Sequence, residues 1–115
     1  MGTLHTLSGR IRLAAVVPRG AIVLLKVEDV SRLDAAAVVL AELVLPLPEG
    51  AAAGAEIPFS LGVQVPDGQP TIGVRVHVDA NASGEVTEGD LLSTRAYPVL
   101  TNGAPDQVIV DVVAV

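Results

Sequence analysis

Side chains that carry oxygen recur at regular spacing between Asp79 and Asp90, in the stretch DANASGEVTEGD. Oxygen groups fall at positions 1, 3, 5, 7, 9 and 12 of this stretch, and Gly84 falls at position 6. A calcium-binding loop surrounds its ion with this spacing, because the glycine allows a sharp turn in the middle. The stretch departs from the pattern at its end, where aspartate replaces the usual glutamate. The candidate calcium ligands are Asp79, Asn81, Ser83, Glu85 and Asp90.

A hairpin turn explains the same residues without a metal. Aspartate, asparagine, serine and glycine are the residues that tight turns select. Calcium loops of this spacing are usually flanked by helices, whereas β-type segments flank this stretch on both sides. The sequence therefore favours a plain turn with no metal and no cofactor, and a calcium site is the alternative.

The residue types that catalysis needs are scarce. The chain has no cysteine and no serine in a Gly-x-Ser-x-Gly turn, and only His5 and His77 are available to activate a nucleophile. His77 follows Arg75 on the outward face of a predicted strand, where a solvated surface histidine is expected. Glu28 and Asp29 are adjacent on another predicted strand, so they point to opposite faces and cannot act as a carboxylate pair. We therefore expect no catalytic residues and no enzyme activity.

The composition indicates one acidic domain with an aliphatic core. Half of the 115 residues are apolar, which is enough for a core of its own, and Phe59 and Tyr97 are the only aromatic residues. Seven basic residues against thirteen acidic residues give a net charge of −6. Nucleic-acid binding is excluded as a function, because it depends on basic residues that neutralise phosphates and on aromatic residues that stack on bases.

No targeting or membrane-spanning segment is visible. The first twelve residues lack the basic start and apolar run of a signal peptide. The apolar stretch Ala35–Leu47 is interrupted by Glu42 and is shorter than the ~20 residues that a spanning helix needs. We expect a soluble chain with no direct membrane insertion, and its compartment stays open.

Alternation of apolar and polar residues predicts an all-β protein. It is clearest in Thr71–Asp79, where every second residue is a β-branched aliphatic. Short strands separated by turns rich in glycine, proline and asparagine are typical of a single-domain antiparallel β-sandwich of about seven strands, immunoglobulin- or transthyretin-like, over residues 1–115. The predicted strands are Leu4–Leu13, Ile22–Val30, Val38–Leu45, Glu56–Val65, Thr71–Asp79, Glu85–Tyr97 and Gln107–Val115.

The segment from Ser31 to Leu45 fits two structures. Ser31 and Asp34 have the spacing of a helix capping box, and the alanine-rich run that follows could be helical. The β-branched residues Val38, Val39 and Val44, with Pro46 close behind, favour a strand instead. On residue pattern alone the strand is preferred, and the helix is the alternative.

Arg75 is the one basic residue that projects from the strand Thr71–Asp79. Glu28, Asp29 and Asp34 supply acids near the end of another predicted strand. A cross-strand ion pair is the simplest expectation, worth less than about 1 kcal/mol if it is exposed. A ligand contact is the functional alternative.

Four blocks of residues, taken in chain order, carry a family resemblance. They are VEDVSRLD at Val27–Asp34, IPF at Ile57–Phe59, VRV at Val74–Val76 and VLT at Val99–Thr101. With these blocks the chain resembles the YbaY/YscW family of small bacterial lipoproteins, which includes the pilotin-like chaperones of type III secretion. The resemblance covers roughly residues 8–115. It implies a β-sandwich and a role in binding or assembly, with no catalytic residues, and it also favours the strand over the helix after Asp34.

The chain departs from the family at its membrane anchor. Family members usually have a signal peptide that ends at a lipidated cysteine, and this sequence has neither. The resemblance therefore implies the cell envelope or periplasm, whereas the missing lipobox is compatible with the cytoplasm.

Apolar side chains also fall on faces that alternation assigns to solvent. Val23, Leu25 and Val27 are assigned to the core, so Ile22 and Leu24 point outward. In the same way, Val38 and Leu40 are predicted to point outward from the next strand. Aliphatic residues on an outer face indicate an interface. The predicted protein-binding residues are Ile22, Leu24, Val38 and Leu40.

These observations together predict a non-enzymatic protein-binding or assembly module of the pilotin or chaperone kind, without the lipid anchor. Its partner is another protein or a second copy in a homodimer. The alternatives are a self-associating structural β-sandwich and a calcium-binding secreted module.

Overall fold

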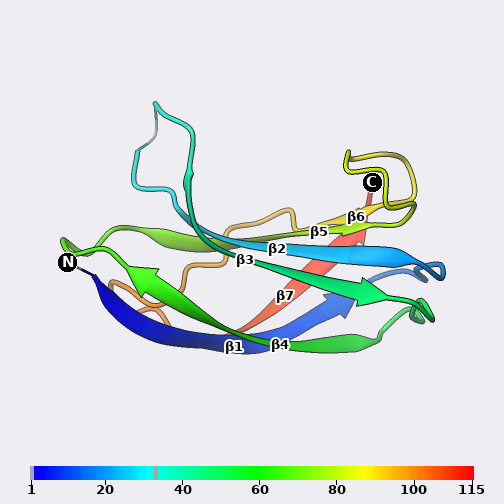
Figure 1. Ribbon diagram of the computed structural model, residues 1–115, viewed down its shortest axis with the longest axis horizontal. Coiled ribbons are helices and arrows are strands. Elements are labelled where there is room, and N and C mark those ends of the chain that lie inside the picture. The colour runs from blue at the N-terminus through cyan, green and yellow to red at the C-terminus, as the bar shows by residue number, and fades with distance from the viewer. Residues whose placement is uncertain (1, 33) are drawn as a thin grey trace.

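The computed structural model describes residues 2–32 and 34–115, and every regular element in this part of the chain is a β-strand (Figure 1). The all-β prediction is confirmed, and none of the described residues forms a helix of the length and apolarity that a membrane crossing needs. Leu33, which belongs to the VEDVSRLD block, lies outside the described residues. The strands are β1 (Thr3–Leu13), β2 (Ala21–Asp29), β3 (Val38–Leu47), β4 (Glu56–Val65), β5 (Ile72–Asp79), β6 (Leu91–Leu92) and β7 (Gln107–Ala114).

The strands form one curled sheet, in the order β3-β2-β5-β6-β7-β1-β4. The two end strands, β3 and β4, come into contact, so the sheet is nearly closed and barrel-like. The prediction of two separate sheets was therefore wrong, and an immunoglobulin- or transthyretin-like arrangement is not seen. The antiparallel prediction also fails for one pair, because β7 runs parallel to β1 before it crosses obliquely to β6 (Figure 1).

The core follows from the alternation in the central strands. In β2, Ala21, Val23, Leu25 and Val27 are buried, and they pair with or face the buried alternate residues of β5. The core is aliphatic as expected, and Phe59 and Tyr97 are both part of it.

A β-bulge reverses the predicted orientation of Leu40. Val27 pairs with Ala41, but the next residue of β2, Glu28, pairs with Val39, so Leu40 is the extra residue of β3. An extra residue shifts the alternation of everything beyond it. Leu40 packs against the core, and its prediction as an outward-facing residue was wrong. Val38 is exposed, as predicted.

Ser31 ties two strands together and does not begin a helix. Its amide and hydroxyl both donate to Asp29 Oδ1, at 3.0 and 2.6 Å, and its Oγ accepts the amide of Thr71 at 2.8 Å. The hydrogen bonds from the Ser31 hydroxyl and amide lower the pKa of Asp29. The end of β2 is thereby fastened to the start of β5, and the predicted strand Val38–Leu45 forms.

The predicted sixth strand, Glu85–Tyr97, is mostly absent. Only Leu91 and Leu92 pair as a strand, and beyond them single contacts replace a ladder. Ser93 Oγ accepts the amide of Val76 at 2.9 Å. The buried Tyr97 places its hydroxyl where it accepts the amide of Asp111, in the middle of β7, at 2.9 Å. The side chain of Tyr97 therefore joins this segment to β7, where a strand was expected to do so.

Replacing Tyr97 with phenylalanine is expected to lower the free energy of unfolding by about 1–3 kcal/mol, because the amide of Asp111 loses its acceptor. Phenylalanine keeps the ring, so the packing is unchanged. Urea denaturation of both proteins measures the difference. Equal midpoints would show that the amide finds water or another acceptor.

Candidate functional site

The loop from Asp79 to Asp90 is held closed by the two carboxylates at its ends. Asp79 accepts the amides of Ser83 at 3.1 Å and Gly84 at 2.8 Å. Asp90 accepts the amides of Ala80 at 2.9 Å and Thr87 at 3.0 Å. The two carboxylates lie in the interior of the fold, with 2% of Asp79 and none of Asp90 exposed. The loop therefore folds around its own acids.

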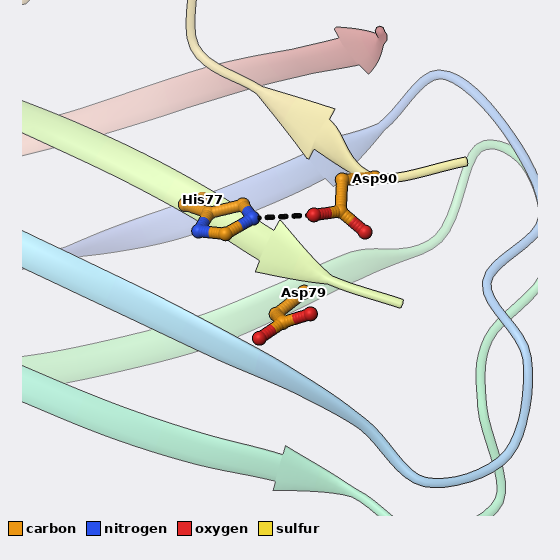
Figure 2. A group of neighbouring side chains, drawn as sticks. All are labelled: His77, Asp79 and Asp90. Atoms are coloured by element: carbon orange, nitrogen blue, oxygen red, sulfur yellow. Dashed lines mark hydrogen bonds and ion pairs between the residues drawn. The ribbon is translucent and has the colours of Figure 1, made fainter. Parts of the chain in front are cut away.

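His77 completes a cluster with these two aspartates (Figure 2). Alternation along β5 places His77 and Asp79 on one face, and Asp90 comes immediately before β6, the next strand of the sheet. The Nε2 atom of His77 lies 2.7 Å from Oδ2 of Asp90. Each of the three residues has one nitrogen or carboxylate oxygen atom that could bind a metal ion, and these atoms all lie within 4.8 Å of one another. The expectation of a solvated surface histidine was wrong, since only 16% of the His77 side chain is exposed.

The electrostatics of the cluster keep Asp90 ionised. Burial raises the pKa of Asp90, but hydrogen bonds from His77 and from the amides of Thr87 and Ala80 together outweigh it, so the pKa lies below its usual value. The fully buried carboxylate of Asp90 is therefore charged at neutral pH.

The other calcium-ligand candidates lie around this cluster. Thr87 Oγ1 is 3.5 Å from both Asn81 Oδ1 and Asp90 Oδ1. Ser83 Oγ is 3.0 Å from the backbone oxygen of Glu85. The spacing in the sequence indicated these residues. Glu85 differs from the prediction because its main-chain oxygen, and not its carboxylate, makes the contact with Ser83. His77 was missed, although its position two residues before Asp79 on a strand places it on the same face.

The His77–Asp90 pair resembles the base and orienting acid of a hydrolase, which activate a hydroxyl nucleophile next to the histidine. Ser93 is the nearby candidate because it lines the same hollow as His77. Its hydroxyl is turned to the main chain of Val76, from which it accepts at 2.9 Å and to which it donates at 3.4 Å. Among the described residues, no hydroxyl group is hydrogen-bonded to His77.

Two hollows of about 330 Å³ each follow one another along the outer face of β5. They share Arg75 and Ser93, and we refer to them together as the β5 groove. The first lies over Gly73 and is bounded by Glu28 and Pro98. The second is lined by Leu24, Lys26, Arg75, His77, Gly84, Val86, Leu92 and Ser93.

An ion pair divides the groove. Arg75 Nη2 lies 2.9 Å from Glu28 Oε2, which confirms the expected cross-strand pair with one of the three candidate acids. The Glu28 side chain is 8% exposed and the Arg75 side chain 60% exposed, so the acid is covered and the guanidinium stays at the surface.

The predicted protein-binding residues do not form a single patch. Leu24 lines the groove, but its apolar neighbours there are Val86 and Leu92, which the sequence did not single out. Leu40 packs against the core, and Val38 lies at a separate hollow with Asp29 and Ser31. Ile22 is half-buried near the start of β2, where it pairs with Asp79 of β5.

The fold is that of a known secretion protein. No family model and no curated protein matches the chain. Among solved structures, the chain is similar to an alternative pilotin from the type II secretion system of Vibrio cholerae, with a TM-score of 0.78, 18% sequence identity and coverage of 98% of both chains. A similarity at this identity shows a shared fold. The pilotin-like fold that the sequence resemblance implied is thus supported, and the YbaY/YscW family itself is not shown.

Proposed function

We propose that this protein is a non-enzymatic, pilotin-like module that binds a protein subunit of a secretion system and helps it to assemble. The observation that carries the proposal is the similarity to a pilotin over essentially the full length of both chains. The scarcity of catalytic groups supports it, because among the described residues no hydroxyl group is hydrogen-bonded to His77 of the His77–Asp90 pair.

The β5 groove is the surface that suits such a partner. It offers apolar side chains, Leu24, Val86 and Leu92, beside the surface cations Lys26 and Arg75. Binding sites combine an apolar lining with a few polar groups that fix orientation. The groove follows β5, whose eight residues span roughly 25 Å. It therefore suits a partner segment that carries apolar side chains and an acidic group.

Replacing Leu24 with aspartate is expected to abolish recovery of the partner when the protein is co-expressed with the secretion-system subunits of its own organism. The change places a charge in the apolar part of the groove, where it cannot be paired. Ile109 is the matched control, because it is an exposed aliphatic residue on β7. Ile109→Asp is expected to bind like the wild type. Full binding by Leu24→Asp, with its circular dichroism unchanged, would contradict the groove as the docking surface.

A self-associating role is the second candidate, and the edge strand β3 favours it. Val38, Val39 and Val44 are all exposed on this strand, which is hydrogen-bonded to a neighbouring strand on one side only. An edge strand with exposed aliphatic residues can pair with a second copy in a homodimer. Sedimentation at low and high concentration tests this, and a monomer at every concentration would eliminate it.

A further inference from the structure

We propose that the partner segment in the β5 groove is acidic, and that one of its carboxylates binds the outward side of Arg75, beside Lys26. An aliphatic side chain of the same segment enters the hollow formed by Leu24, Val86 and Leu92. The inference rests on the proposed secretion role, because it names the chemistry of the partner that this role requires.

The groove has a positive charge balance in an acidic protein. Three of the seven basic residues of the chain, Lys26, Arg75 and Arg95, line it. Glu28 is the one acidic residue among the described residues that line it. The chain as a whole has a net charge of −6, so the positive balance belongs to this surface and does not follow from the composition. Because interfaces pair potentials of opposite sign, the groove calls for an acidic partner.

Lys26 and Arg75 lie directly opposite each other on β2 and β5. Like charges at opposite positions of neighbouring strands are destabilising. The ion pair between Lys26 Nζ and Glu42 Oε1 is long, at 4.0 Å, and both side chains are exposed, so it offsets little of this repulsion. A carboxylate bound beside both cations would compensate for the repulsion between them.

The buried Glu28 holds the Arg75 guanidinium in place without covering it. The ion pair uses Nη2 of Arg75, and 60% of the Arg75 side chain stays exposed. A guanidinium has five N–H groups, and among the described residues Arg75 donates through this one nitrogen only. Its other N–H groups can bind a carboxylate through two parallel hydrogen bonds. Arg95, by contrast, already donates through Nε to Tyr97 and through Nη2 to Asp111. Arg75 is therefore the cation best placed to bind an acid of the partner.

The apolar part of the groove lies at a defined distance from the two cations. Leu24 and Leu92 both pair with His77, one on each side of it. This row of residues lies two positions along β5 from the row of Lys26 and Arg75, which corresponds to about 7 Å. Alternate side chains of an extended segment have the same spacing. A segment with an acidic and an aliphatic residue two positions apart therefore matches both parts of the groove.

Reversing the charge of Lys26 tests the acid directly. Isothermal titration calorimetry with the purified secretion-system subunit that the wild type retains compares the wild type with Lys26→Glu. We expect the dissociation constant of Lys26→Glu to be higher by about tenfold or more, because attraction to the partner's carboxylate becomes repulsion. The wild-type dissociation constant should also rise between about 50 and 500 mM sodium chloride, since salt screens exposed charges. The same constant at both salt concentrations would overturn the inference.

Arg10→Glu is the matched control for Lys26→Glu. Arg10 has the same kind of exposed ion pair, with Glu56 at 3.0 Å, and it lies on β1, outside the groove. The two variants change the net charge by the same amount, so a general effect of charge would weaken binding equally in both. Equal dissociation constants for Lys26→Glu and Arg10→Glu would overturn the inference.

Arg75→Lys tests the geometry of the contact, because it keeps the charge beside Glu28 but loses the planar fork of the guanidinium. We expect weaker binding with an unchanged circular dichroism spectrum, and this variant decides if Lys26→Glu fails to fold. Wild-type affinity for Arg75→Lys would overturn the contact with Arg75.

Two outcomes distinguish the failure of this inference from the failure of the proposed function. If Leu24→Asp loses the subunit but Lys26→Glu binds it like the wild type, the groove is the docking surface and the acidic segment is wrong. If the wild type itself binds no subunit of the secretion system, the proposed function is wrong, and the inference that rests on it is overturned as well.

Discussion

Replacing Gly9 with valine is expected to lower the free energy of unfolding by at least about 3 kcal/mol, a large part of the stability of a domain this size. A Cβ atom on Gly9 would lie 1.8 Å from the main-chain oxygen of Val108 and 3.1 Å from the Phe59 ring. Gly9 is on β1, which pairs with β4 on one side and with β7 on the other. Neither neighbouring strand can move away without breaking its hydrogen bonds to β1, so the clash cannot be relieved at a low cost in free energy.

Gly73 is the matched control for this experiment. It is also a glycine inside a strand, but the nearest atom to a Cβ there would be the main-chain oxygen of Tyr97 at 3.9 Å. Gly73→Ala is therefore expected to change stability by less than about 1 kcal/mol. Urea denaturation followed by circular dichroism measures both variants. Similar stabilities for Gly9→Val and Gly73→Ala would mean that β7 is not held close to β1.

The same close approach shows what a sequence pattern can and cannot predict. Alternation predicted six of the seven strands, because burial on one face leaves a clear period of two in β2 and β5. It carries no information about which strand lies next to which. The parallel pairing of β1 with β7 joins residues about a hundred positions apart, such as Ser8 and Gln107. Only the glycine at position 9 hints at a close backbone approach.

Two local errors have equally specific causes. The bulge adds Leu40 as an extra residue of β3, and strict alternation then assigns Leu40 to the outer face although it packs against the core. The predicted strand Glu85–Tyr97 pairs only at Leu91 and Leu92, and beyond them the side chain of Tyr97 accepts the amide of Asp111 in β7. A pattern of apolar residues cannot distinguish these two ways of satisfying a buried amide.

The sequence identified the loop of the candidate site, but it did not predict how deeply the loop is buried. The aspartate, asparagine, serine and glycine residues between Asp79 and Asp90 identified the loop from the sequence, since turn chemistry is a local property. The burial of its two end carboxylates and their contact with His77 were not predictable, because they depend on how the loop packs onto the sheet. The β5 groove likewise needs Leu92 and Val86, which reach Leu24 only in the fold.

Replacing Asp90 with alanine is expected to lower the free energy of unfolding in calcium-free buffer by on the order of 3–5 kcal/mol. Asp90 has no exposed surface, and its carboxylate accepts the amides of Ala80 and Thr87 and bonds to His77. Alanine leaves these three groups without an acceptor in a buried place. Urea denaturation with a chelator present measures the effect. Asp90→Asn keeps the shape of the side chain and one accepting oxygen, so its free energy of unfolding should fall less than that of Asp90→Ala.

The dependence on pH distinguishes the charge of Asp90 from its shape. Because the folded-state pKa of Asp90 is lowered, its ionisation contributes stability above the ordinary pKa of about 3.9, and this contribution is lost as the pH falls through the lowered value. Asp29 and Asp111 also have lowered pKa values, but they titrate alike in wild type and variant and cancel in the difference. The gap in stability between wild type and Asp90→Asn should therefore be widest near neutral pH and narrow below about pH 4, where protonated aspartate resembles asparagine. A gap that stays constant down to acid pH would show that the loop depends on the hydrogen-bonding shape of Asp90 and not on its charge.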